Sequence, residues 1–167
     1  FGDTVRASYE NMIALASRAE AWLQSRGAWT LPLSEPNQGG TCPQHQLISA
    51  VAGKALTCHV VNTPLTRTFA SRNDLATVSQ QGPATPQHAV HTRRVPLIDG
   101  DVEGYARRYR EYLDTHLGKP ASVRMDVAPR IALNPAYGLA AFGESEREAL
   151  MAAAMYVRDI EIITRAS

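Results

Sequence analysis

The sequence has few cysteines, a balanced charge and no long apolar run. Only two of its 167 residues are cysteines, Cys42 and Cys58, which excludes a framework of disulfides and indicates free thiols. The 17 basic and 16 acidic residues give a formal net charge of +1, so no basic surface for nucleic acid or an anionic membrane is expected. No apolar run approaches the roughly 20 residues that a membrane-spanning helix needs.

Several short catalytic motifs are also absent. The chain has no Gly-x-Ser-x-Gly, Gly-x-Gly-x-x-Gly, Walker-type loop, His-x-His or Tyr-x-x-x-Lys. These absences argue against a hydrolase elbow, a dinucleotide fingerprint and a short-chain dehydrogenase centre within this chain. The sequence starts at Phe1 without an initiator Met or a signal peptide, so we expect a fragment or a processed product with a cytoplasmic location.

The periodicity of apolar residues predicts an α/β domain. Helices are expected at 4–26, 44–53, 65–70, 101–117 and from 145 to the C-terminus, with another starting near 72, and strands at 55–61, 130–133 and 138–142. A strand flanked by helices needs sheet neighbours, so these segments predict a small mixed sheet covered by helices. The last helix is expected to have one apolar face, formed by Leu150, Ala153, Ala154, Val157 and Ile160.

One part of the sequence occurs twice. Phe-Gly-Asp-Thr at 1–4, followed by Arg6 and Glu20, is matched by Phe-Gly-Glu-Ser at 142–145, followed by Arg147 and Glu161, at one constant offset. Such self-similarity indicates a duplicated unit. We therefore expect residues 1–27 to be the terminal helix of a preceding copy, 28–43 to be a linker, and 44–167 to be a second, degenerate copy.

Three segments carry a resemblance to a known family. The run Leu-Asn-Pro-Ala-Tyr-Gly-Leu-Ala-Ala-Phe-Gly at 133–143 resembles the end of the class II aldolase/adducin domain, where a strand leads into Asn-His-Gly. Residues 1–10 resemble the segment that comes after that turn in an intact copy. Gly-Pro-Ala-Thr-Pro-Gln-His at 82–88 is similar to a segment of fused rhamnulose-1-phosphate aldolase/alcohol dehydrogenase proteins, in which the second enzyme is a short-chain dehydrogenase.

The resemblance implies an enzyme that has lost its chemistry in this copy. Class II aldolases, which are lyases, hold a divalent metal such as zinc with three histidines, and Tyr137 occupies the position of the histidine in the turn. We therefore expect a non-catalytic structural or interaction part of a sugar-phosphate aldolase fused to a short-chain dehydrogenase. The chain itself would hold no cofactor, whereas the parent protein, a lyase and oxidoreductase of carbohydrate metabolism, would hold a divalent metal and NAD. Expected partners are the preceding aldolase domain and the following dehydrogenase domain in a homo-oligomer, without nucleic acid or membrane.

A polar cluster suggests an alternative function. It consists of Thr85, His88, His91, Thr92, Arg93 and Arg94. Arginine forks and hydroxyls together could bind an anionic sugar phosphate or a nucleotide. The structural alternative is that Thr85 caps a short turn, His88 bonds to backbone, and the two arginines are solvated or pair with Asp99 and Asp101. His88 and His91 could also form a metal pair, but a further ligand would have to come from Cys58 or His59 on another element.

Overall fold

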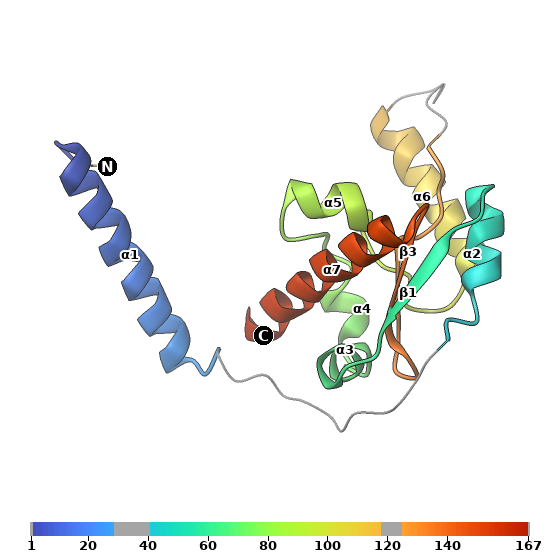
Figure 1. The fold of residues 1–167 in the computed structure, drawn as a ribbon, viewed down its shortest axis with the longest axis horizontal. Helices are drawn as coiled ribbons and strands as arrows, with labels where there is room; N and C mark the ends of the chain where they lie inside the picture. The colour runs from blue at the N-terminus through green and yellow to red at the C-terminus, as the bar shows by residue number, and fades with distance from the viewer. Residues whose placement is uncertain (1, 29–40, 118–124, 167) are drawn as a thin grey trace.

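The computed structural model describes residues 2–28, 41–117 and 125–166, and the predicted linker 28–43 lies mostly outside them (Figure 1). The helices are α1 (Val5–Ser25), α2 (His45–Ala52), α3 (Pro64–Ala70), α4 (Leu75–Val78), α5 (Pro86–Thr92), α6 (Val102–Leu117) and α7 (Glu146–Ala166). The strands are β1 (Thr57–Val61), β2 (Ile131–Asn134) and β3 (Gly138–Gly143). The predicted α/β class and the predicted helices and strands are confirmed, and α5, expected only as a short turn, is an additional helix.

The three strands form one antiparallel sheet in the order β1-β3-β2. Cys58 pairs with Phe142, and Ala132 pairs with Ala140. An isolated parallel bridge, outside the named strands, joins Leu97 to Ala132 at the β2 edge, and the parallel pairing that a mixed sheet implies occurs at this bridge while the strands themselves pair antiparallel. Every residue of β3 is buried because it is the central strand and both of its faces are covered.

Alternate side chains of the sheet enter two separate cores. One core lies beneath α2 and α6 and contains Ala140 and Phe142 of β3. The other lies beneath α3 and α7 and contains Leu139 and Ala141 of the same strand. Because successive side chains of a strand point to opposite faces, a single strand serves both cores. The fold is therefore three layers, with α2 and α6 on one face of the sheet and α3 and α7 on the other (Figure 1).

Helix starts agree with the capping residues that the sequence offers. The hydroxyls of Thr4, Thr63 and Thr85 each accept a hydrogen bond from a backbone N–H in the first turn of α1, α3 and α5. Proline occupies the first helical position of α3 and α5, where its missing N–H costs nothing. Ser145 accepts from the N–H of Glu148 at 3.3 Å and starts α7 in the same way.

The buried face of α7 overlaps the predicted apolar face only in part, at Ala153 and Ile160. Its buried residues are Ala149, Ala152, Ala153, Tyr156, Asp159 and Ile160. Leu150 instead remains 42% exposed and borders an open groove beside β1 with Val157. The alanines at 149, 152 and 153 allow the helix backbone to approach the sheet closely.

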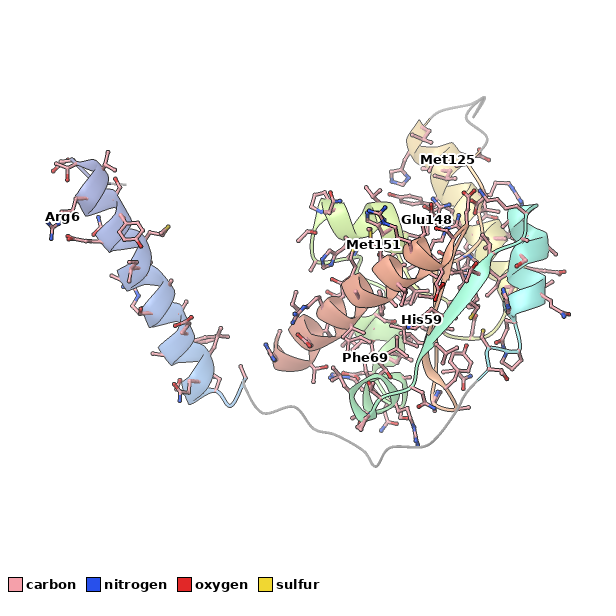
Figure 2. The ribbon with its side chains drawn as sticks, viewed as in Figure 1. Arg6, His59, Phe69, Met125, Glu148 and Met151 are labelled. Atoms are coloured by element: carbon pink, nitrogen blue, oxygen red, sulfur yellow. The ribbon has the colours of Figure 1, made fainter. Side chains whose placement is uncertain are left out.

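Helix α1 has no buried residue and lies apart from the other elements, with Arg6 pointing into solvent (Figure 2). Its large apolar side chains are exposed, among them Met12 at 57% and Trp22 at 58%. An unpartnered apolar helix face of this kind is typical of a surface that another element covers. No helix of the described residues is long and apolar enough to cross a membrane.

Candidate functional site

The turn that joins β2 to β3 carries the residue that the sequence singled out, Tyr137. Asn134 stabilises the turn, because its carbonyl accepts from the N–H of Tyr137 at 3.2 Å and its side chain accepts from the N–H of Ala136 at 2.9 Å. The Tyr137 ring is only 4% exposed and packs in the core under α2 and α6. Its hydroxyl lies 3.7 Å from the Sγ atom of Cys42.

The donors around Tyr137 do not fit a zinc site. Burial, with the neighbouring Cys42, raises the pKa of the Tyr137 phenol, which keeps it neutral and a poor zinc ligand at neutral pH. The Nε2 atom of nearby His45 lies 2.6 Å from the carbonyl oxygen of Leu56. This hydrogen bond already engages the nitrogen that a metal ion would need. Within residues 2–28, 41–117 and 125–166, no three His, Cys, Asp or Glu side chains are grouped to hold a metal ion. That Tyr137 marks a former metal position stays a prediction.

Helix α5 separates the predicted polar cluster into different environments. Thr85 caps the helix, as the structural alternative had it, by accepting from the N–H of His88 at 3.3 Å. Thr92 is buried and donates to the carbonyl of His88 at 2.9 Å. Both hydroxyls are therefore used inside α5, and whether the cluster binds a ligand stays a prediction.

His88 is held by a buried carboxylate and not by the backbone that the structural alternative had assumed. Its Nδ1 lies 2.7 Å from Oδ1 of Asp159, which is 2% exposed in the middle of α7. The same oxygen accepts from the backbone N–H of Ala84 at 3.1 Å. This buried carboxylate, which contacts the His88 ring and the Ala84 N–H through one oxygen, ties the start of α5 to α7.

Arg93 is held by Asp126 and not by Asp99 or Asp101. Its Nη2 lies 3.2 Å from Oδ1 of Asp126, while Nη2 of Arg130 lies 2.6 Å from Oδ2. Burial alone would raise the pKa of Asp126, but the two guanidinium groups outweigh it and lower that pKa. Arg93 has a φ of +66°, an unfavourable backbone conformation for a residue with a Cβ. Asp99 instead pairs with Arg108 at 3.2 Å.

Arg93 and Arg130 border an open pocket of about 220 Å³ where α5, the end of β3 and the start of α7 meet. Its lining residues are Val90, His91, Arg93, Arg130, Phe142, Gly143 and Glu148. Figure 2 marks Glu148 in the first turn of α7. One oxygen of Glu148 accepts from the backbone N–H of Glu144 at 2.9 Å, which restrains this carboxylate at the rim. Three side chains that can carry positive charge thus surround one restrained carboxylate.

Arg94 belongs to a different pocket. Its guanidinium lies 5.1 Å from the ring centroid of Tyr112 on α6, in a pocket of about 130 Å³ that Tyr105 and Tyr109 also line. His91 and Arg93 therefore line the same pocket, whereas Arg94 lies beside α6 and His88 contacts Asp159 on α7. Sequence reasoning missed Asp126, Arg130 and Asp159, because no local motif marks a residue whose partner lies on a distant element.

Comparisons with known proteins agree with the resemblance. No solved structure matches this chain. The chain is 24% identical over 196 aligned residues to the "Uncharacterized oxidoreductase YuxG" of Bacillus subtilis (strain 168). That match covers all of this chain but 28% of the relative, so the chain spans little more than a quarter of the relative's length. A family model described as "Aldolase class II, second domain" matches residues 38–167, and the chain therefore belongs to the class II aldolase family.

Proposed function

We propose that this chain is a non-catalytic, structural part of a sugar-phosphate aldolase fused to a short-chain dehydrogenase. The observation that carries the proposal is the use of Tyr137 as a core residue in the turn where the family places a metal-binding histidine. A neutral phenol facing a thiol cannot replace an imidazole as a zinc ligand. The oxidoreductase named among the relatives supports the fused arrangement. The metal, NAD and the retro-aldol chemistry would then belong to other parts of the parent protein.

The first prediction concerns metal and activity. After incubation with zinc and removal of free metal, elemental analysis should find far less than one zinc per chain. The same sample should not cleave rhamnulose 1-phosphate in an assay for the released aldehyde. Tyr137→Phe is the matched control, since it removes only the hydroxyl. One zinc per chain, or a cleavage activity that Tyr137→Phe reduces, would overturn the proposal.

The two copies of the repeat support the proposed domain organisation. The constant offset between the copies carries Val5–Ser25 of α1 onto Glu146–Ala166 of α7, so the two helices have the same limits. In α7, Tyr156, Ile160 and Ile163 pack against the sheet. Their counterparts in α1 are Leu15, Ala19 and Trp22, which border an open apolar groove. Helix α1 thus has the sheet-facing surface of α7, and no strand of the described residues covers it, which fits the terminal helix of a preceding copy.

Removal of α1 provides a second prediction. Deleting residues 1–26 should change the midpoint of thermal unfolding by less than about 2 °C, because α1 has no buried side chain. Deleting 146–166 as the control should abolish cooperative unfolding, because α7 covers one whole core. Circular dichroism at rising temperature measures both. Loss of cooperative unfolding after removal of α1 would show that this helix is part of the domain formed by the rest of the chain, and not the terminal helix of a preceding copy.

A second candidate function is binding of an anionic sugar phosphate, and the pocket beside Arg93 and Arg130 favours it. Asp126 orients both guanidinium groups, and His91 adds a third donor. Arginine forks held in this way suit a phosphate. Asp126 and Glu148 oppose an anion there, which is the reason for ranking this function second.

The third prediction is an affinity for inorganic phosphate and for a ketose phosphate at this pocket. If the domain binds anions, calorimetry should give a saturable signal that Arg130→Gln weakens about tenfold or more, the loss of about 1.4 kcal/mol of binding free energy. Arg158→Gln is the control, since Arg158 is 71% exposed on the far part of α7. Absence of a saturable signal for both ligands would favour the purely structural function.

A further inference from the structure

The tyrosines of α6 line one small pocket. Tyr105, Tyr109 and Tyr112 are spaced by four and three residues, so their rings lie on one side of the helix. Neighbouring ring centroids are 5.9 and 6.0 Å apart, and the planes of the Tyr105 and Tyr109 rings differ by only 8°. The pocket has a volume of about 130 Å³, and its lining is completed by Gln80, Arg94, Val95 and Arg108.

The size of the pocket suits a single six-membered ring, since an apolar cavity of roughly 150 Å³ can hold one benzene molecule. Two of its polar groups are already engaged within the protein. The hydroxyl of Tyr105, a residue that is 3% exposed, donates to the carbonyl of Val95 at 3.0 Å, and Nε2 of Gln80 donates to the carbonyl of Pro96 at 3.1 Å. A ligand there therefore meets mainly aromatic rings.

Arg93 and Arg94 each place a guanidinium group over a tyrosine ring of α6. The Cζ atom of Arg93 lies 5.7 Å from the ring centroid of Tyr109, and that of Arg94 lies 5.1 Å from the ring centroid of Tyr112. Such a contact uses the flat face of the guanidinium group and leaves the N–H groups in its plane for an acceptor.

The two arginines differ in what those N–H groups bind. Nη2 of Arg93 donates to the carbonyl of Asp126 at 3.1 Å and pairs with its carboxylate at 3.2 Å. Arg94 is exposed, and within residues 2–28, 41–117 and 125–166 it forms no ion pair with a carboxylate. A cation held over an aromatic ring without a carboxylate is a place where a carboxylate from outside can bind.

Arg108 adds a second guanidinium group to the pocket. It pairs with Asp99 at 3.2 Å, and this pair is open to solvent, because the two side chains are 55% and 46% exposed. An exposed pair contributes little, so Asp99 is a weak competitor for an incoming anion.

We propose that this pocket binds a small aromatic carboxylate. The ring packs against Tyr109 and Tyr112, and the carboxylate accepts two parallel N–H groups from Arg94. A sugar acid of the same size would bring several hydroxyls, and the engaged groups of Tyr105 and Gln80 are not available to receive them. The site is separate from the pocket beside Arg93 and Arg130 and does not depend on the function proposed above.

The test is a titration of the complete 167-residue protein, labelled with nitrogen-15, with benzoate. We expect saturable changes in the amide resonances of α6 and of Arg94, with a dissociation constant of about 1 mM or below. Three further probes separate the two parts of the ligand. Benzamide has the ring without the charge, acetate has the charge without the ring, and glucuronate has a charge on a ring that is not aromatic. Each should bind at least about tenfold more weakly than benzoate.

Variants locate the site. Arg94→Gln should weaken benzoate binding about tenfold and leave the remaining resonances in place, because the side chain is exposed. Arg107→Gln is the matched control on the same helix, where Arg107 is also exposed, and it should bind benzoate like the unmodified chain. Absence of saturable changes, equal affinities for benzoate and benzamide or glucuronate, or unchanged binding by Arg94→Gln would each overturn the proposal.

Discussion

Replacing Asp159 with alanine should lower the free energy of unfolding by about 3–5 kcal/mol. The substitution removes the acceptor of both the His88 ring and the Ala84 N–H, which lie 2.7 and 3.1 Å from its Oδ1 atom. Since Asp159 is 2% exposed, water cannot replace these hydrogen bonds without a rearrangement of α5. Urea unfolding followed by circular dichroism measures the difference between the variant and the unmodified chain.

Two controls test whether the loss comes from the buried acceptor. Asp159→Asn keeps an acceptor oxygen of nearly the same shape, so it should cost less than half as much as the alanine variant. Glu161→Gln removes a carboxylate from the same helix that pairs with Arg158, whose side chain is 71% exposed, and it should cost less than about 1 kcal/mol. If Asp159→Ala cost no more than Glu161→Gln, the link between α5 and α7 would contribute nothing measurable.

Replacing Gly138 with alanine should lower the free energy of unfolding by at least about 3 kcal/mol. Gly138 has a φ of +76°, and a Cβ there would lie 2.4 Å from Oγ1 of Thr66 and 2.8 Å from the carbonyl of Val61. Thr66 cannot move away easily, because its fully buried hydroxyl donates to Val61 at 2.7 Å and accepts from the N–H of Thr63 at 3.1 Å. The turn after Tyr137 therefore requires glycine for space as well as for its backbone conformation.

The variant Gly53→Ala separates the steric clash of an added Cβ from the strain of a positive φ. Gly53 ends α2 with a φ of +68°, and nothing lies within 4 Å of a Cβ added there. Its alanine variant carries the backbone strain alone and should cost about 1–2 kcal/mol. Equal losses in the two variants would mean that Thr66 gives way and that the close approach of α3 to the turn has little energetic weight.

The candidate site was only partly predictable from local sequence. The capping role of Thr85 is expected from its place before a proline, and the structure confirms it. The partners of His88 and Arg93 could not be found in this way, because Asp159 and Asp126 lie on other elements.

The sequence by itself determined where the helices and strands form, because capping hydroxyls, prolines, glycines and apolar periodicity act within a few residues. The segment around the turn at Tyr137 also pointed to the family, which the match over residues 38–167 shows. Only the tertiary structure decided which face of α7 is buried, where alanines replaced the expected Leu150. It also decided which charged side chains pair. The buried face of α7 and these pairs both depend on how closely elements distant in sequence approach each other, and the residue pattern of one element does not determine that approach.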